Sequence, residues 1–203
     1  MQSRKTVTIV FTDVVGSTAL GEGQDIEVLR RVMTTYFDRM REVLERHGGT
    51  VEKYIGDAIV AVFGIPEVHE DDPLRAVRAA HEMRAALDEL NRELEERHRL
   101  RIRARTGVNT GEILAEEARP DAPLTADAAN LAARLEQAAS TGEVLLGEST
   151  YRMVRDAVTA EPAGPLELKG KAEPQPAWRL LEVSAEVRGI ARRLDSPIVG
   201  RDE

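Results

Sequence analysis

The order of segments along the chain predicts an α+β fold with a ferredoxin-like βαββαβ core and additional strands and helices towards the C-terminus. Three observations predict this class. They are an apolar run of β-branched residues near the start, a long segment of helical periodicity after it, and two strand-like runs that flank a Gly-Asp turn. A chain of 203 residues can bury a core as one domain. We therefore expect one sheet with helices on one of its faces.

The first part of the chain supplies most of this core. Residues 7–11, VTIVF, are mostly apolar and mostly β-branched, as in a buried strand. Residues 25–47 carry apolar side chains at helical spacing, and the two glycines that follow are a typical helix end. Residues 50–55 and 58–63 then predict a hairpin around the Gly-Asp turn.

The second part of the chain continues the same alternation. Asp72 is the predicted N-cap of a second long helix, with a proline at the first helical position. Residues 103–109 and 112–115 predict a second hairpin that turns at Thr110 and Gly111. The later elements expected are a helix over residues 126–139, a strand over 143–146, a short helix over 149–155, and strands over 165–169 and 177–181.

The composition excludes several classes of protein. Acidic residues outnumber basic ones by 36 to 28, and the net charge of -8 argues against nucleic acid as a partner. The chain has no cysteine, so it has neither a disulfide framework nor a thiolate metal site. No run approaches the roughly 20 apolar residues of a transmembrane helix. Because residues 1–5 lead straight into a strand, we expect a cytoplasmic protein with no membrane partner.

Two carboxylates stand at comparable places in this pattern. Asp13 follows the first strand, and Asp57 lies in the turn of the first hairpin. Either one alone would be an ordinary turn or cap residue. Neighbouring strands would place them side by side, and two like charges so close are unfavourable without a cation. Magnesium takes one or two carboxylates and fills its shell with waters and phosphate oxygens, so the pair predicts a two-metal site.

The turn after the first strand is a candidate phosphate-binding segment. It consists of Val14, Val15, Gly16, Ser17 and Thr18, and a helical segment follows it. Its backbone N–H groups are suited to phosphate oxygens, although the Walker pattern of glycines and lysine is absent.

Other polar residues are candidates for substrate contacts, but each can also be explained as an ordinary surface residue. Asn130 and Arg134 lie one turn apart on the predicted third helix, where a solvated helix face is the plain interpretation. Lys53 belongs to a predicted strand, and Lys169 and Lys171 flank a glycine in a loop, all typical surface positions.

Four short stretches, taken together, resemble a known family. They are FTDVVGST at residues 11–18, KYIGDA at 53–58, NLAARLE at 130–136 and LKGK at 168–171. In this order and spacing they resemble the class III adenylyl/guanylyl cyclase catalytic domain over residues 5–181. The resemblance implies the class III nucleotide cyclase fold and cyclisation of a nucleoside triphosphate, with pyrophosphate leaving as the ribose 3′-oxygen attacks the α-phosphorus.

The resemblance also implies roles for the candidate residues. Asp13 and Asp57 would hold two Mg²⁺ or Mn²⁺ ions per active site, helped by the backbone carbonyl of Val14. Residues 14–18 would bind the phosphates as substrate-binding residues.

The remaining roles fall on later parts of the chain. Lys53 would contact the purine base, Asn130 would orient the ribose and Arg134 would stabilise charge on the α-phosphate. Lys169 or Lys171 would meet the terminal phosphates. Domains of this family work as head-to-tail dimers, and the resemblance therefore implies a homodimer. Its composite sites would combine the carboxylates of one subunit with the base, ribose and phosphate contacts of the other.

One departure from the family pattern leaves an alternative open. The second base-reading position holds Pro123, which has no side-chain hydrogen-bonding group and no N–H, and the usual glycine four residues before Asn130 is Ala126. Lys53 favours ATP, whereas Pro123 weakens base discrimination. The alternative function is a weak or inactive cyclase-like module that binds nucleotide or dimerises and regulates an attached ATPase domain.

The end of the chain suggests what such an attached domain is. Residues 1–185 are predicted to form the catalytic domain and residues 186–203 a polar tail or linker. Residues 196–203 resemble the entry to an AAA-type or related ATPase domain of multidomain bacterial regulators. A diguanylate cyclase is disfavoured, because YIGD at residues 54–57 stands where that family has its Gly-Gly-Asp/Glu-Glu-Phe signature.

Overall fold

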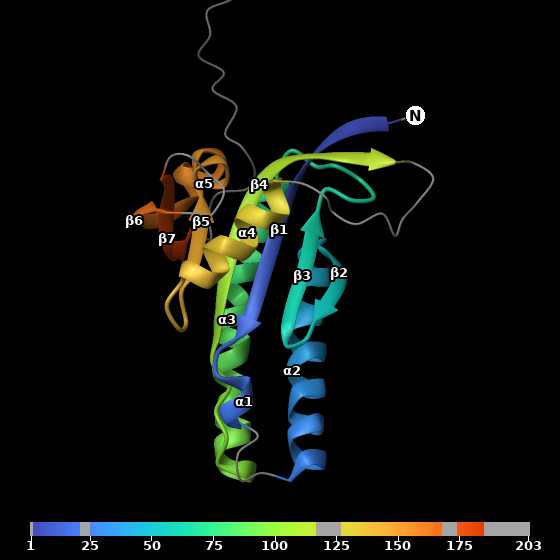
Figure 1. Cartoon of the computed structure of the whole chain (residues 1–203), viewed down its shortest axis with the longest axis vertical. Helices are drawn as coiled ribbons and strands as arrows, with labels where there is room; N and C mark the ends of the chain where they lie inside the picture. The colour runs from blue at the N-terminus through green and yellow to red at the C-terminus, as the bar shows by residue number, and fades with distance from the viewer. Residues whose placement is uncertain (1, 21–24, 117–126, 168–173, 185–203) are drawn as a thin grey trace, which may run out of the picture.

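The computed structural model describes residues 2–20, 25–116, 127–167 and 174–184. Within these ranges, one sheet has its strands in the order β2-β3-β1-β4-β5-β7-β6. The elements, in chain order, are β1 (Gln2–Val14), α1 (Ser17–Leu20), α2 (Ile26–Arg46), β2 (Thr50–Ile55), β3 (Ala58–Phe63), α3 (Asp72–His98), β4 (Ala104–Glu116), α4 (Asp127–Ala138), β5 (Val144–Gly147), α5 (Glu148–Val154), a 3₁₀ turn (Arg155–Ala157), β6 (Val158–Leu166) and β7 (Gln175–Val183) (Figure 1).

The predicted βαββαβ opening is confirmed by β1, α2, β2, β3, α3 and β4. Strands β1 to β4 form the antiparallel half of the sheet, with β1 between β3 and β4. Strand β5 then joins β4 in parallel and leads into the antiparallel pair β6 and β7. The predicted hairpin of β2 and β3 has the bounds expected from the sequence.

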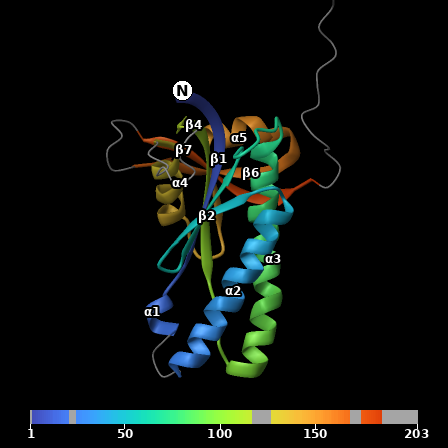
Figure 2. The same ribbon diagram turned by 90° about the vertical axis from the view of Figure 1, so that its right-hand side faces the viewer.

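One face of the sheet is covered by α2 and α3, which lie side by side and extend beyond the ends of the strands (Figure 2). Asp25 caps α2 by accepting the N–H of Glu27 at 2.7 Å, which explains why the helix begins at Ile26. The core on this face consists of aliphatic and aromatic side chains with almost no exposed surface. Its largest members include Tyr36, Met40, Leu44, Ile59, Phe63, Leu90, Ile102 and Leu146.

The opposite face carries α4, so helices cover both faces rather than the single face expected. A second cluster joins Ala128 and Ala132 of α4 to Val7, Ile9 and Val60 of the strands. Figure 1 shows α4 in front of β4, while α3 lies behind it.

The predicted second hairpin, with its turn at Thr110 and Gly111, is wrong. Strand β4 runs without interruption and pairs with β1 from Gln2 opposite Glu116 to Val14 opposite Ala104. Gly111 is needed for a different reason, since a Cβ there would come within 2.8 Å of the Ala128 Cβ. The glycine therefore admits a helix and does not form a turn.

Two further bounds differ from the sequence prediction. The N-cap of α3 is Asp71, and Asp72 is instead the first helical residue, whose buried carboxylate accepts the His69 N–H at 2.7 Å. Strand β6 begins at Val158, well before the predicted residue 165, because it pairs along β7 through two irregularities. None of the helices in the described ranges is long and apolar enough to cross a bilayer.

Candidate functional site

The two predicted carboxylates meet at one end of the antiparallel half of the sheet. Asp13 is the second-last residue of β1, and Asp57 lies in the β2–β3 turn, which Gly56 makes possible with a φ of 62°. Strand β1 pairs with β3 up to Thr12 opposite Ile59, so the next residues bring Asp13 towards Asp57. Both carboxylates are half-buried.

The charge of Asp57 acts on the Asp13 carboxylate. Burial raises the pKa of Asp13, and the negative charge of Asp57 raises that pKa further. The Arg105 guanidinium and the Val14 backbone N–H act in the opposite direction and lower it. A carboxylate whose charge is disfavoured by a neighbouring carboxylate belongs to a site that a cation would stabilise.

The predicted phosphate-binding turn lies directly beside Asp13. The Val15 N–H donates to the Arg103 carbonyl at 2.7 Å, and Gly16 adopts a φ of 71°. No atom beyond its chain neighbours lies within 4 Å of a Cβ placed at Gly16, so the turn is open at this point. Helix α1 starts at Ser17. The side chain of Thr18 lies outside the described part of the structure.

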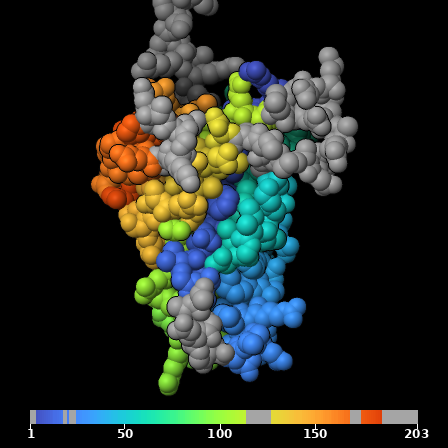
Figure 3. Space-filling model, viewed as in Figure 1, coloured from blue at the N-terminus to red at the C-terminus, as the bar shows by residue number. Residues whose placement is uncertain are grey.

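Arg105 and Glu136 belong to the site although neither was singled out from the sequence. Arg105 stands opposite Asp13 in the β1–β4 register, and its Nη2 lies 3.9 Å from Asp13 Oδ2. Its Nε donates to Glu136 Oε1 at 2.6 Å, and its Nη1 donates to the Gln137 carbonyl at 3.2 Å. One guanidinium therefore links the end of α4 to the carboxylate pair (Figure 3 shows α4 and the end of β1 on the same surface).

Glu136 is held as a nearly buried carboxylate. Only 3% of its side chain is exposed. Burial raises its pKa, the Arg105 contact lowers it, and the charges of Asp13 and Asp57 raise it again. The signal available in the sequence was a carboxylate next to Leu135 on the apolar side of a predicted helix, where a buried charge requires a partner.

Asn130 and Arg134 both lie on α4, as predicted. Asn130 is exposed and Arg134 is half-buried. In the part of the chain that the structure describes, neither side chain has a hydrogen bond or ion pair. These two side chains remain available to a ligand or a second subunit.

Lys53 lies on the edge strand β2. Its Nζ donates to Glu52 Oε1 at 3.2 Å, and 42% of the side chain is exposed. The pairing of β2 with β3 shifts register between Val51 and Lys53. Lys169, Lys171, Pro123 and Ala126 lie outside the described residues.

The comparisons with known proteins identify the class to which this site belongs. The family model of the adenylate and guanylate cyclase catalytic domain matches residues 1–181, and the chain therefore belongs to this family. It is a class III cyclase catalytic domain. The adenylyl cyclase CyaB of P. aeruginosa has a similar crystal structure, with a TM-score of 0.85 and 27% identity over 93% of this chain and 100% of the other.

Other relatives carry both activities in their names. The guanylyl cyclase Cya2 matches at a TM-score of 0.84 and 29% identity, over 93% of this chain and 98% of the other. Adenylate cyclase 1 of Rhizobium meliloti (strain 1021) is 28% identical over 92% of this chain. The chain spans only 29% of that relative and 20% of an uncharacterized protein from the same strain.

The residues present fit the divalent cations that this family implies. Among the described residues, no group of three or more His, Cys, Asp or Glu side chains converges as a closed metal cage. An open pair of carboxylates beside backbone groups is what Mg²⁺ requires when phosphate oxygens complete its shell. The Tyr36 hydroxyl supports the same fit. It is fully buried without a hydrogen-bond partner, and both Asp13 and Asp57 act with burial to raise its pKa.

Proposed function

We propose that this domain converts a purine nucleoside triphosphate, ATP in preference to GTP, into a 3′,5′-cyclic nucleotide and pyrophosphate. The observation that carries the proposal is the pair Asp13 and Asp57, gathered at neighbouring strand ends beside an open turn. Phosphoryl transfer depends on positioning and on neutralising charge more than on covalent help from the protein. A carboxylate pair next to free backbone groups suits both tasks.

The chain's own groups divide this work. Asp13, Asp57 and the Val14 carbonyl would hold two Mg²⁺ or Mn²⁺ ions, which when bound lower the pKa of the attacking hydroxyl and neutralise the leaving phosphates. The N–H groups of residues 16–18 would bind phosphate oxygens, because the Val14 N–H faces Asp13 and the Val15 N–H already donates to the Arg103 carbonyl. Arg105 keeps the end of α4 beside Asp13 through its contact with Glu136.

The residues of α4 would contact the substrate's reacting centre. Arg134 offers a planar fork of donors that matches the α-phosphate oxygens, and Asn130 orients the ribose. Loss of a donor that stabilises developing charge costs about 2.7–4 kcal/mol of transition-state stabilisation, and Arg134 would contribute on that scale. Lys53 reads the base, and Lys169 or Lys171 meets the terminal phosphates.

A homodimer with composite sites accounts for the lack of partners of Asn130 and Arg134 among the described residues of their own chain. Strand β2 is an edge strand that carries Tyr54 and Ile55 with 44% and 50% of their surface exposed, an apolar surface suited to a second subunit. In a head-to-tail dimer, one subunit supplies Asp13 and Asp57 and the other supplies the base, ribose and α-phosphate contacts.

The preference for ATP rests on Lys53 alone. The similar solved structures include both an adenylyl and a guanylyl cyclase. A third is a rhodopsin-guanylyl cyclase core with converted specificity in complex with ATPalphaS, 26% identical at a TM-score of 0.78. The fold therefore accepts either base. A proline at position 123 removes one polar base contact, so we expect modest discrimination.

The direct test is product formation from ATP and from GTP, each with Mn²⁺ and with Mg²⁺, at several protein concentrations and followed by chromatography. We expect cyclic AMP as the main product, with a specific activity that rises with protein concentration because the dimer is the active form. Tight nucleotide binding without cyclic product at any metal concentration would favour the alternative, a regulatory module for an ATPase domain beyond the linker at residues 186–203.

Composite sites are tested by mixing two inactive variants. Asp57→Ala removes a metal carboxylate and Arg134→Ala removes the α-phosphate contact, so each homodimer is expected to be inactive. A mixed dimer has one site with both defects and one intact site, and partial activity should return. Arg152→Ala, an exposed arginine on α5 that pairs with Glu148, is the matched control and should keep full activity. Folded mixed dimers without any recovery would count against shared sites.

A further inference from the structure

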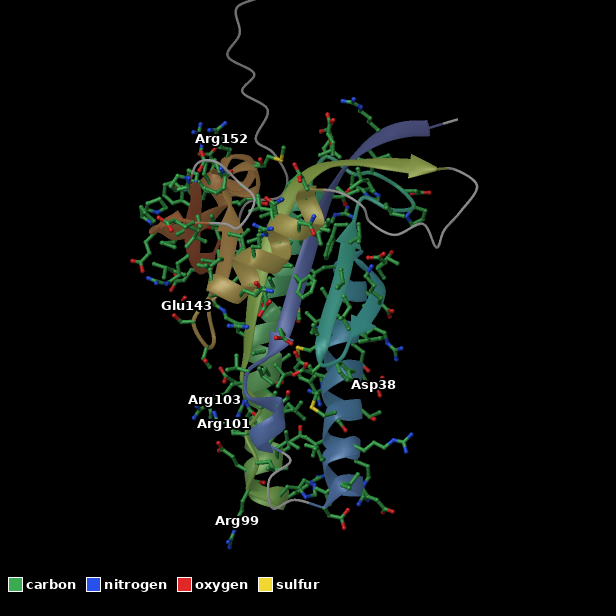
Figure 4. All side chains as sticks on the ribbon, viewed as in Figure 1. Asp38, Arg99, Arg101, Arg103, Glu143 and Arg152 are labelled. Carbon is green, nitrogen blue, oxygen red and sulfur yellow. The ribbon has the colours of Figure 1, made fainter. Side chains whose placement is uncertain are left out.

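A cavity of about 310 Å³ lies on the sheet face opposite to the carboxylate pair. Its walls come from α3, from the chain that leads into β4, and from the turn between α4 and β5. Figure 4 shows the labelled side chains of Arg101, Arg103 and Glu143 on the same side of the molecule, next to α3. The volume lies at the lower end of the range of pockets that bind small molecules.

The interior of this cavity is apolar and adaptable. Met40, Met83, Ala80 and Ile102 line it, and each is at most 3% exposed. Methionine side chains are flexible and polarisable, so they accommodate ligands of different shape. The cavity therefore suits an aromatic or branched aliphatic group and is too small and too apolar for a nucleoside triphosphate.

The rim of the cavity carries charges, most of which are already paired. The Arg84 guanidinium donates to the carbonyls of Leu180 and Leu181, and Arg101 pairs with Glu95 at 2.8 Å. Glu143 pairs with Arg179 at 2.7 Å.

Arg103 is the exception on this rim. It lines the cavity, and it has no hydrogen bond or ion pair through its side chain within the described residues. An unmatched guanidinium beside an apolar cavity selects a carboxylate, which it can bind through two parallel hydrogen bonds.

The cavity is in contact with the strands that hold the carboxylate pair. Thr12 and Thr106 line it, and their hydroxyls share a buried hydrogen bond of 2.9 Å. The next pair in the same register is Asp13 opposite Arg105, whose side chains face the other side of the sheet. In addition, the Arg103 carbonyl accepts the Val15 N–H of the turn beside Asp13 at 2.7 Å.

We propose that this cavity is an effector site for a small amphipathic carboxylate, whose acid group binds Arg103 and whose apolar body enters between α3 and the sheet. Occupation of the cavity acts on Thr12 and Thr106 and hence on the position of Asp13. Binding at the cavity stands on its own geometry, and only its effect on divalent cations rests on the proposed function. Because coupling between two sites is reciprocal, cations at Asp13 must change the affinity of the cavity by the same factor.

Titration calorimetry with 2-naphthoate as the probe tests binding, in the absence of metal and nucleotide. We expect saturable binding to the wild type, weaker binding of the uncharged 2-naphthamide, and amide shifts in NMR spectra around Thr12, Thr106 and Arg103. Arg103→Gln should lower the affinity about tenfold or more, since hydrogen bonds to charged groups contribute roughly 1.5–3 kcal/mol. Arg99→Gln removes the same charge from an exposed position outside the cavity and should leave the affinity unchanged.

Three results would overturn the effector site. They are the absence of saturable binding, an equal loss in Arg103→Gln and Arg99→Gln, and amide shifts confined to another surface. A second titration, of Mn²⁺ with and without 2-naphthoate, tests the coupling. An altered Mn²⁺ affinity supports it, and an unchanged affinity overturns the effect on Asp13 while leaving a binding site. If the protein takes up 2-naphthoate but no Mn²⁺ at all, the proposed metal site fails and the cavity does not.

Discussion

The two faces of the central sheet are built from different kinds of residue. The face under α2 and α3 is a continuous layer of large apolar side chains with almost no exposed surface. The face under α4 has small residues at the contact, with Gly107 and Gly111 facing the helix, and a charged group, Arg105 with Glu136, at its end. One face therefore supplies most of the stability, while the other positions the candidate site residues.

The reason lies in how closely each helix approaches the strands. Side chains separate α2 and α3 from the sheet, and an apolar core fills this gap except at the cavity beside Arg103. Helix α4 rests on strand backbone, since a Cβ at Gly107 would clash with the Ala132 carbonyl and the Glu136 N–H. A helix seated on backbone is fixed in position, which is what Asn130 and Arg134 require if they are to reach a substrate.

The largest effect is expected from Leu44→Ala on the apolar face. Leu44 is fully buried, so the variant should lose about 2–5 kcal/mol of unfolding free energy through lost burial and a new cavity. Urea denaturation measures this loss. The Mn²⁺ affinity of the folded variant, followed by electron paramagnetic resonance, should stay at the wild-type value. A matching loss of metal affinity would show that the two faces are not separable.

Compared with Leu44→Ala, Gly107→Ala is expected to lose less unfolding free energy but more turnover. The added methyl group clashes with the backbone of α4, and overpacking of this kind costs roughly 1–3 kcal/mol. Because α4 must shift, turnover should fall more than stability suggests. Gly111→Ala is the graded control, since its Cβ meets only Ala128, at 2.8 Å. Equal turnover in the two variants would remove the argument that α4 is positioned by backbone contact.

Tyr36 is the residue that connects the apolar face with the carboxylate pair. Its ring lies in the apolar core, while its unpartnered hydroxyl is close enough to Asp13 and Asp57 for their charges to raise its pKa. Tyr36→Phe should leave the fold intact and weaken Mn²⁺ binding by about tenfold, as loss of a group that supports metal ligands does. Tyr151→Phe, where the ring stacks on Trp178, is the control and should bind Mn²⁺ normally. Unchanged affinity with raised stability would mean that the hydroxyl has no role at the site.

The smallest effect concerns the pH dependence of stability. The folded-state pKa of Asp13 is raised above its ordinary value of 3.8, so the folded protein binds more protons than the unfolded chain, and stability falls as pH rises through that window. Asp57→Asn removes a charge that raises this pKa, so the pKa should fall and the loss of stability should shrink. Carboxyl NMR titration and urea denaturation between about pH 4 and 7 measure both quantities.

Asp38→Asn on α2 is the control for that titration. Asp38 is exposed and pairs with Arg41, away from the carboxylate pair. It should leave the pKa of Asp13 unchanged. An unchanged Asp13 pKa in Asp57→Asn itself would contradict the close approach of the two carboxylates.

Local signals were sufficient for several elements and insufficient for others. The β2–β3 hairpin and the start of α2 were predicted to within a residue, because a Gly-Asp turn and the Asp25 cap act on their own neighbours. Gly111 misled the prediction, since a glycine that admits α4 and a glycine that makes a turn look the same in one dimension. The early start of β6 was also missed, because its first residues are held by pairing with β7, which lies further along the chain.

The candidate site also has some features that local sequence signals predicted and others that they did not. Local patterns in the sequence were enough to predict the class of fold, the two acidic positions Asp13 and Asp57, and the helix that carries Asn130 and Arg134, because strand, turn and helix signals act over short separations. The folded chain was needed to show that Arg105 joins Asp13 to Glu136, that α4 lies opposite α2 and α3, and that a cavity lies behind the carboxylates. Each of these depends on strand register and on packing across long separations in the chain, which no short pattern records.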